Sequence, residues 1–275
     1  MTRRADVLSA EDLAKAPPPP ERTASDRLFD LALWGGVAVL LIVSFAPAEI
    51  WKAPLLFQNS ENMQTFTREF LRPDFANGRT YVEQMWLTIQ IAAWGTFLAV
   101  VAAVPFGLMC SRNIAPDWIR RPTRLLMDVL RSVNELVLGT VFLVAVGLGP
   151  FAGVMALAIH TAGVLGKLFS EAVEAIDPQP VEGVRAVGAA KLHEIVWGVL
   201  PQVAPLWTSY ALYRFESNAR SATVLGLIGA GGIGQLLFES INSFDYGQTA
   251  AIAIVIVAAV SAIDLLSQQM RKRLL

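Results

Sequence analysis

Charged residues and cysteine are scarce in this chain of 275 residues. Asp, Glu, Lys and Arg together make up only 16% of it, and they leave a formal net charge of −1. This balance provides no basic field for a nucleic acid, so we expect no nucleic-acid partner. Cys110 is the single cysteine, which excludes an internal disulfide and a multi-cysteine metal site. The P-loop pattern G-x-x-x-x-G-K-[ST] is absent as well, so any use of ATP requires a second protein.

Apolar residues are abundant instead. They make up 54% of the chain, and the mean hydropathy is +0.49, which is more apolar than a soluble domain of this size usually is. A helix needs about 20 apolar residues to cross a bilayer. Six stretches approach or exceed that length, so we expect an all-α membrane protein with about six transmembrane helices. The stretches are Leu28 to Ala46, Glu83 to Cys110, Thr123 to Gly147, Phe151 to Ile176, Gln202 to Leu227 and Gly247 to Leu266.

The distribution of Lys and Arg predicts the orientation in the membrane. Residues 1–27 are polar and contain the run Pro17 to Pro20, so we expect a flexible cytosolic tail rather than a cleaved signal. The turn near Pro150 and the segment from Ser221 to Gln248 contain no Lys or Arg and are expected outside. The chain ends would then both be cytosolic, together with the basic residues of the remaining segments: Arg112, Arg120, Arg121, Arg124, Arg185, Lys191, Arg271, Lys272 and Arg273.

The segment 47–80 follows the first apolar stretch and is expected on the outer, periplasmic side. It carries both signs of charge, which weakens the positive-inside argument for a segment of this length. Met63, Phe66, Phe70 and Leu71 fall on one face at helical spacing. The pattern predicts an amphipathic helix, either flat on the membrane surface or packed against the bundle. Residues 81–270 then form the transmembrane domain.

A segment between the fourth and fifth stretches, residues 178–201, has features of a docking surface. Asp177-Pro178 should end the fourth helix, and Pro201 is expected to open the fifth. Between them, small, charged and apolar residues alternate at roughly helical spacing, and Gly188 permits close approach of another backbone. Polar side chains provide a rim for a partner: Arg185, Lys191, His193 and Glu194.

A glycine cluster follows the fifth stretch. Gly229 to Gly234 satisfies G-x-G-x-x-G, but it follows an apolar helix and not a strand, which excludes a dinucleotide site. The cluster instead predicts a sharp turn, which is either a re-entrant or gate segment continuing through Phe238 or a flexible outer turn. Its glycines are Gly226, Gly229, Gly231, Gly232 and Gly234.

Two motifs carry a resemblance to a known family. Glu182-Gly183-Val184-Arg185-Ala186-Val187-Gly188, followed by Leu200-Pro201, resembles the cytoplasmic EAA loop of ABC-importer permeases, although Gly183 and Val184 replace two alanines and Gly198 stands where isoleucine is common. The stretch Ser217 to Gly234 resembles the fifth-span motif of phosphonate-import permeases, and its A-T-x-L-G and G-A-G-G-I-G portions occur in methionine permeases as well. The stretches Leu212 to Glu216, Ser170 to Pro178 and Thr88 to Ala92 are also similar, so the resemblance covers residues 70 to 270.

The resemblance implies a type I ABC-importer permease bundle in the bacterial inner membrane. It implies a homodimer that works by alternating access, an ATPase dimer that binds ATP and Mg, and an external substrate-binding protein. The chain itself would hold no cofactor and catalyse no reaction. The implied substrate is a phosphonate or a related oxyanion such as phosphite or phosphate. The implied ATPase-coupling residues are Glu182, Arg185, Gly188, Lys191, Leu200 and Pro201.

Charged residues within the apolar stretches require a reason, because each costs about 2.5–3.5 kcal/mol at a helix centre on insertion scales. Three pairs are four residues apart and could neutralise each other: Arg131 with Glu135, Lys167 with Glu171, and Glu216 with Arg220. Two interpretations of these pairs remain open. In the first, the pairs serve only to fix how the helices pack; in the second, Arg131 and Arg220 line a path for an oxyanion together with Arg214. We expect His160, alone on an apolar helix, to hydrogen-bond a backbone group.

Three alternatives remain open from the sequence. A permease of the same fold could carry methionine or another small solute. An intramembrane enzyme is disfavoured because the apolar stretches contain no Ser-His or paired-Asp arrangement and no H-E-x-x-H pattern. A proton-coupled carrier would differ from an ABC importer because its uptake of substrate would continue after depletion of ATP.

Overall fold

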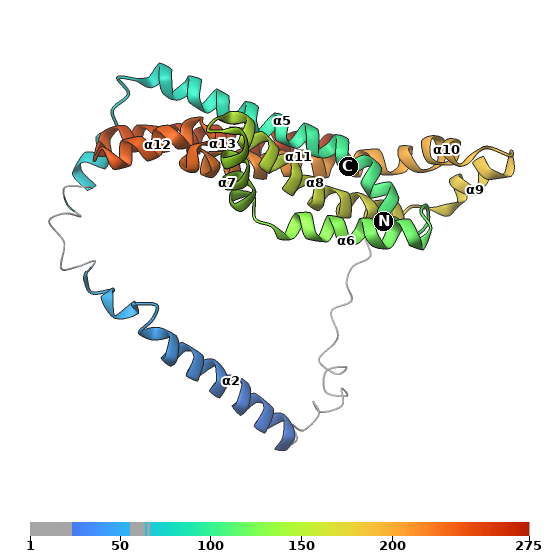
Figure 1. Ribbon diagram of the computed structural model, residues 1–275, viewed down its shortest axis with the longest axis horizontal. Helices are drawn as coiled ribbons and strands as arrows, with labels where there is room; N and C mark the ends of the chain where they lie inside the picture. Colours follow the sequence, from blue (N-terminus) through green and yellow to red (C-terminus); the bar gives the residue numbers. More distant parts are fainter. Residues whose placement is uncertain (1–23, 56–63, 65–66, 275) are drawn as a thin grey trace, which may run out of the picture. The chain divides into compact units, whose positions relative to one another are not determined.

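The computed structural model of the chain describes residues 24–55, 64 and 67–274 (Figure 1). These residues form helices and turns without a strand, which confirms the all-α prediction. The chain divides into two compact units, residues 1–64 and 65–275. Four helices are long and apolar enough to cross a membrane, and two bent helix pairs raise the number to as many as six.

The first unit contains α2 (Ala24–Phe45) and the short 3-10 helix η1 (Ile50–Lys52). The 22 residues of α2 extend about 33 Å, enough to cross a hydrocarbon core of about 30 Å. Its large apolar side chains, such as Leu31, Trp34 and Ile42, are exposed, as expected of a lipid-facing helix. The helix begins four residues before the predicted first span, because polar residues are tolerated in a first helical turn.

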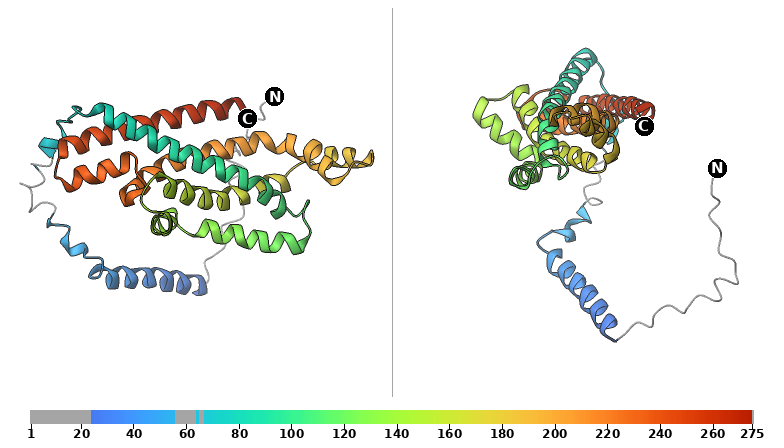
Figure 2. Two further views of the ribbon diagram at one scale, coloured as in Figure 1. Left: turned by 45° about the horizontal axis from the view of Figure 1, so that its top comes forward. Right: turned by 90° about the vertical axis from the view of Figure 1, so that its right-hand side faces the viewer.

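The second unit is built around four long helices (Figures 1 and 2). They are α5 (Gly78–Cys110), α8 (Pro150–Glu174), α11 (Leu200–Leu225) and α13 (Tyr246–Leu274). The most extensive packing joins α5 to α8. A Cβ at Gly107 would lie 2.7 Å from the Cβ of Phe169, and one at Gly95 would lie 2.8 Å from the Cβ of Leu157. Glycine at these positions lets the two backbones approach closely, as is typical of membrane helices.

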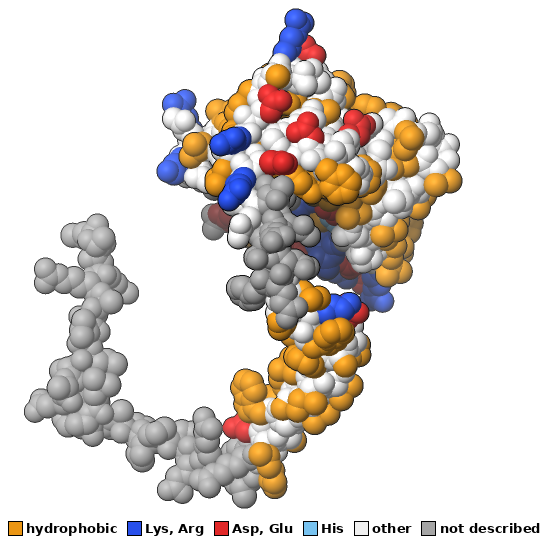
Figure 3. Space-filling view, turned by 90° about the vertical axis from the view of Figure 1, so that its left-hand side faces the viewer, with side chains coloured by type: hydrophobic (Ala, Val, Ile, Leu, Met, Phe, Trp, Pro, Cys, Tyr) orange, Lys and Arg blue, Asp and Glu red, His pale blue; other side chains and the backbone are white. Residues whose placement is uncertain are grey.

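The outer face of the bundle is apolar. Trp86, Trp94, Phe97 and Val101 follow one another on the exposed side of α5. Figure 3 shows hydrophobic side chains along the flank of the bundle and charged ones at the end that faces the viewer. In the same unit, residues 67–70 are helical and Phe70 and Leu71 are exposed, whereas Met63 and Phe66 of the predicted amphipathic helix lie outside the described residues.

The predicted third span, Thr123 to Gly147, is broken into two helices. These are α6 (Asp117–Ser132) and α7 (Glu135–Val146), bent by 87°. Val133 and Asn134 at the break have extended backbones, with ψ of 123° and 141°. The Asn134 side chain accepts a hydrogen bond from the Leu136 N–H at 2.8 Å and caps the start of α7. The prediction of one continuous helix was therefore wrong.

The predicted loop 178–201 is largely helical. It contains α9 (Pro178–Ala186), α10 (Lys191–His193) and the π-helical turn η2 (Glu194–Val199), which runs directly into α11. The fifth helix therefore does not open at Pro201; its helical backbone begins ten residues earlier, at Lys191. We call residues 178–199 the coupling hairpin, after the ATPase-coupling role that the sequence resemblance predicts for them. Figures 1 and 2 show it extending from one end of the bundle.

After α11 the chain turns through the π-helical η3 (Gly226–Ala230) into α12 (Ile233–Asn242), with a bend of 58°. Gly229, Gly231 and Gly232 have φ of +106°, +79° and +75°, which residues with a side chain rarely adopt. The predicted sharp turn is therefore present. Figure 1 shows α12 beside the start of α13, at the end of the bundle away from the coupling hairpin.

Candidate functional site: coupling hairpin and charged groups of the bundle

A helix cap and two glycines determine where the two arms of the coupling hairpin begin, reverse and pack together. Asp177 caps α9 by accepting a hydrogen bond from the Gln179 N–H at 3.0 Å, and Pro178 occupies the first helical position. Gly188 reverses the chain with φ of +77°, and no heavy atom lies within 4 Å of the position its Cβ would take. A Cβ at Gly198 would lie 3.0 Å from the Cα of Val181. Glycine at 198 therefore lets the returning arm pack against α9.

One carboxylate joins the two arms. The Arg185 guanidinium on α9 donates to Glu194 on η2 through Nε at 3.1 Å and Nη2 at 3.0 Å, and Lys191 Nζ lies 3.3 Å from the same group. The helical backbone from Lys191 to Ala230 would extend about 60 Å, twice the hydrocarbon thickness, so part of it extends beyond the membrane. The charged residues Lys191 and Glu194 identify its first turns as that part. The hydrogen bonds from Arg185 are the main reason that the pKa of Glu194 falls to about 2.

A cavity of about 290 Å³ lies at the base of the hairpin. Of the predicted coupling residues, Glu182, Arg185 and Lys191 line it, while Gly188 stands at the exposed hairpin tip. Leu200 and Pro201 lie within the continuous helix that leads into the bundle. Glu194, Asn113 from the turn between α5 and α6, and Glu174 from the end of α8 complete the polar part of the wall.

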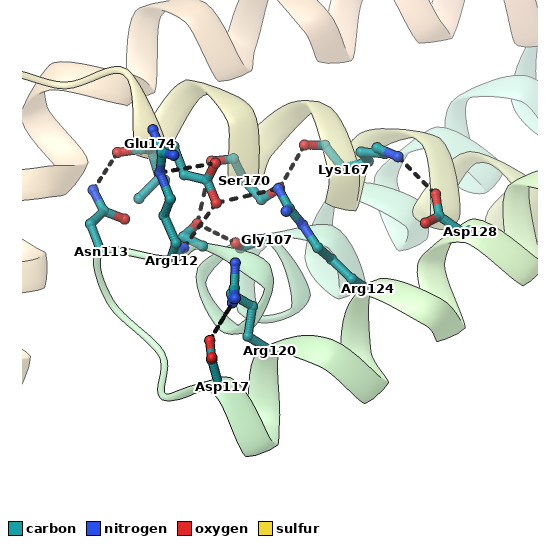
Figure 4. Close-up of polar contacts among 12 residues, drawn as sticks. Gly107, Arg112, Asn113, Asp117, Arg120, Arg124, Asp128, Lys167, Ser170 and Glu174 are labelled. Atoms are coloured by element: carbon teal, nitrogen blue, oxygen red, sulfur yellow. Dashed lines mark hydrogen bonds and ion pairs between the residues drawn. The ribbon is translucent and has the colours of Figure 1, made fainter.

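Glu174 also ties α6 to α8 (Figure 4). Its carboxylate lies 3.3 Å from Arg124 Nη2 and 3.7 Å from Arg112 Nε, and it accepts a hydrogen bond from the Arg112 N–H at 2.9 Å. Asn113 Nδ2 donates to the Val173 carbonyl at 2.7 Å. The turn between α5 and α6 is thus bound to the residues that immediately precede the coupling hairpin.

The predicted pairs Arg131 with Glu135 and Lys167 with Glu171 do not form. Asp128 binds both cations instead, with Arg131 Nε and Lys167 Nζ each 2.9 Å from its Oδ1. Arg131 and Glu135 lie on opposite sides of the break between α6 and α7, so the four-residue spacing does not bring them together. Lys167 reaches across from α8 to α6, where Asp128 lies.

The predicted pair of Glu216 with Arg220 does form, at 3.3 Å, but as part of a larger network. Arg271 of α13 lies 3.0 Å from Glu216, and Asp264 of α13 lies 3.3 Å from Arg220. Asp264, which is isolated along the sequence, is therefore a partner of Arg220. The two acids and two bases balance in charge and join α11 to α13.

Glu135 lies on a third surface, where α7, α8 and α11 meet, and Arg214 is on the face of α11 that carries Ser221. Ser221 Oγ donates to Glu135 Oε1 at 2.8 Å, and His160 Nε2 lies 3.6 Å from Oε2. His160 also hydrogen-bonds the Val133 carbonyl through Nδ1 at 2.9 Å, so its predicted backbone contact is confirmed. The structure thus divides four of the five path candidates among three separate helix contacts, while Arg214 forms no ion pair among the described residues.

The glycine turn borders a cavity of about 370 Å³ at the opposite end of the bundle from the coupling hairpin. Gly229, Gly231 and Gly232 line it together with Gln84 and Glu239. The Gly149 N–H donates to the Gly229 carbonyl at 3.1 Å, and the Ile233 N–H donates to Thr88 Oγ1 at 2.9 Å. Both bonds fix the turn against α8 and α5. Among residues 24–55, 64 and 67–274, no group of three or more His, Cys, Asp or Glu side chains could hold a metal ion.

Residues 103–274 match the family model described as "Binding-protein-dependent transport system inner membrane component". The chain belongs to this family. It is the permease subunit of an ABC importer, an inner-membrane component without an enzymatic reaction of its own. Its fold resembles a solved structure of the MetNI methionine ABC transporter in an inward-facing conformation, with a TM-score of 0.62 and 20% identity, over 70% of this chain and 95% of that chain.

Two curated relatives of this permease are more similar in sequence. The phosphite transport system permease protein PtxC of Stutzerimonas stutzeri is 37% identical over 272 residues, which cover 96% of this chain and 99% of the relative. The putative cryptic phosphonate transport system permease protein PhnE2 of Escherichia coli K12 is 64% identical over 118 residues, which cover 43% of this chain and 97% of the relative. The first relative matches the permease over nearly its whole length.

Sequence reasoning missed several polar groups of the permease because their partners lie far away in the chain. Asp128 was not recognised as the acceptor for Lys167, 39 residues away. Arg271 was assigned only to the cytosolic end, although it reaches Glu216, 55 residues away. The signal available for both was an ionisable residue inside or next to an apolar stretch, which requires a partner of opposite charge.

Proposed function

We propose that this permease imports a phosphorus oxyanion, with phosphonate as the first candidate and phosphite and phosphate as related ones. The observation that carries the proposal is the 37% identity to a phosphite transport permease over 96% of the chain. The 64% identical segment of a phosphonate permease supports the same chemical class. Arginine in the bundle suits this class, since its planar fork pairs with oxyanions through two parallel hydrogen bonds.

The assembly we propose contains two copies of this chain, a cytosolic ABC ATPase dimer and an external substrate-binding protein. Both chain ends and the coupling hairpin would lie on the cytosolic side, which agrees with the basic residues Arg271, Lys272 and Arg273 at the end of α13. ATP and Mg would be bound by the ATPase. Its nucleotide cycle would move the coupling hairpin and open the path to each side in turn.

The coupling hairpin is proposed to dock into the ATPase through its exposed tip at Gly188. The Arg185–Glu194–Lys191 contact supports this role, because it joins both arms and lets the hairpin move as one body. Leu200 and Pro201 would pass that movement directly into α11, since the helix is continuous there. The glycine turn at the other end of α11 is proposed to act as the outer gate.

Arg131, Arg214 and Arg220 remain our candidates for lining the path, with Glu135 and Glu216 beside them. Gln at each arginine should reduce uptake while the complex still assembles. Arg131 and Arg220 already bind carboxylates in the structure. We therefore expect the largest loss of uptake at Arg214.

Uptake of labelled phosphonate, phosphite, phosphate and methionine should be measured in cells that lack this chain and in cells that regain it. A Gly188→Arg variant runs alongside, since the bulky side chain should prevent docking of the ATPase. Chain-dependent uptake of a phosphorus oxyanion that is lost in the variant supports both the substrate class and the coupling. Uptake of methionine alone would overturn the substrate class, and uptake unaffected by Gly188→Arg would overturn the docking role.

A further inference from the structure

The break between α6 and α7 creates a small polar site around Glu135. Two side chains from other helices approach its carboxylate, Ser221 from α11 and His160 from α8. Arg214 precedes Ser221 by seven residues on the same continuous helix and so lies on the same face of α11. Ser221 Oγ donates to Oε1 at 2.8 Å, and His160 Nε2 lies 3.6 Å from Oε2. Glu135 is also the first residue of α7, a helix of 12 residues whose N-terminus favours negative charge. The start of α7, the Ser221 hydroxyl and the Arg214 guanidinium each suit an anion.

Arg214 provides the cation of this site, and its guanidinium forms no ion pair with another residue that the structure describes. Its Nε is buried without a hydrogen-bond partner, and the residues that the structure describes offer its guanidinium no ion pair within 4.0 Å. Its position on the same face of α11 as Ser221, which hydrogen-bonds Glu135, places it on the side of the helix that faces this carboxylate. An arginine inside a membrane bundle normally has partners, because an unpaired charge there is costly. Arg214 therefore has hydrogen-bond donors available for a ligand.

The hydrogen bond of His160 to the backbone determines which of its ring nitrogens donates and which accepts. Its Nδ1 contacts the Val133 carbonyl at 2.9 Å, and a carbonyl oxygen can only accept, so Nδ1 carries the proton. In the neutral ring Nε2 is then an acceptor, which cannot hydrogen-bond a carboxylate. A monoprotonated phosphorus oxyanion carries both an O–H and negatively charged oxygens. Its O–H can donate to Nε2 while its charged oxygens accept from Arg214 and Ser221.

We propose that Arg214, His160 and Ser221 form an oxyanion site in which the Glu135 carboxylate holds the place of the ligand. A monoprotonated phosphorus oxyanion displaces this carboxylate during transport. Because Glu135 is tethered beside the site, it competes at high effective concentration and keeps binding weak. Weak binding is what a transport path requires, since a tightly held ligand is not released. The inference rests on the proposed substrate class and assigns that substrate a site.

The decisive measurement is equilibrium binding of labelled methylphosphonate and inorganic phosphate to the purified permease–ATPase complex in nanodiscs, without the substrate-binding protein. Glu135→Gln removes the competing charge and should tighten binding at least about tenfold, and it should slow maximal uptake because release slows. Adding Arg214→Gln to Glu135→Gln should abolish that gain. Glu135→Asp keeps the negative charge but holds it farther from the site, because the Asp side chain is shorter. It should increase the affinity for the oxyanion less than Glu135→Gln does.

Glu171→Gln is the matched control. It removes an exposed carboxylate of α8 that forms no ion pair among the described residues, and it should leave the affinity unchanged. Unchanged or weaker binding in both Glu135→Gln and Glu135→Asp overturns the inference, as does an equal gain in Glu171→Gln. If Glu135→Gln does not assemble, Glu135→Asp alone decides. Failure of the wild-type complex to take up any phosphorus oxyanion in cells would instead overturn the proposed substrate class.

Discussion

Asn218 Nδ2 donates a hydrogen bond to Thr96 Oγ1 at 2.9 Å and thereby joins the second half of α11 to the middle of α5. The Asn218 Oδ1 atom accepts from Thr161 Oγ1 of α8 at 3.0 Å. All three side chains are buried. The amide therefore uses both of its ends to hold three helices in one register.

Replacing Asn218 with Ala should lower the stability of the permease by about 1–2 kcal/mol, since hydrogen bonds between membrane helices contribute about 0.6 kcal/mol on average and up to about 1.7. Thermal unfolding in detergent measures the change. Thr140→Ala is the control, because the Thr140 hydroxyl is exposed and bonds only the Val137 carbonyl of its own helix. Equal melting temperatures for the wild type and Asn218→Ala would contradict the role of the amide.

Glu194→Gln should loosen the coupling hairpin, because it leaves Arg185 and Lys191 without their shared charge. Hydrogen exchange of the amides in residues 178–199 should become several-fold faster. Glu171→Gln, an exposed carboxylate on α8 without an ion pair among the described residues, should leave it unchanged. Exchange that stays at the wild-type rate in Glu194→Gln would show that the contact does not hold the two arms together.

The pH dependence of the same hairpin follows from the depressed pKa of Glu194. The pKa of about 2 in the folded chain lies below the ordinary value of 4.5, so the stabilisation is fully present above about pH 4.5. It is lost as the pH falls from there toward 2. We expect amide exchange in the hairpin, corrected for its intrinsic pH dependence, to be constant between pH 5 and 8. A transition within that range would mean that another group controls the hairpin.

Gly188 should tolerate Asn much better than Val. Its φ of +77° costs about 1–2 kcal/mol for most residues with a Cβ, whereas Asn adopts this region more readily. Neither side chain would meet a heavy atom within 4 Å at its Cβ. Co-purification of the ATPase with the permease should fall in Gly188→Val and remain closer to wild type in Gly188→Asn. Equal losses in both variants would point to the loss of contact with the partner and not to backbone strain.

Gly226→Ala should disrupt the glycine turn after α11. An added Cβ would lie 2.7 Å from the Gly231 carbonyl oxygen and 2.8 Å from the Gly234 Cα, so the backbone of the turn would have to shift. Overpacking of this kind costs about 1–3 kcal/mol. Thermal unfolding should show the loss, while Gly78→Ala, with nothing within 4 Å of its Cβ, should unfold like the wild type. A stable Gly226→Ala permease would mean that the turn relaxes easily.

The sequence by itself determined features that depend on neighbours along the chain. Apolar stretches of the right length predicted the membrane helices, because the hydrocarbon core imposes a minimum length on a span. The clustered glycines predicted the turn after α11, since only glycine readily adopts the backbone angles found at Gly229, Gly231 and Gly232. The four-residue spacing of Glu216 and Arg220 predicted an ion pair that forms because α11 is continuous between them.

Tertiary structure alone decided which charges meet. The extended backbone at Val133 and Asn134 separated Arg131 from Glu135, and it delivered Glu135 to Ser221 and His160, 86 and 25 residues away along the chain. Contacts of this kind depend on the relative rotation and depth of packed helices, which small residues such as Gly163 set. A Cβ there would lie 2.7 Å from the Arg131 backbone nitrogen. Spacing along one helix carries no information about that geometry, so the partners of Asp128, Glu135 and Arg271 emerge only from the packed bundle.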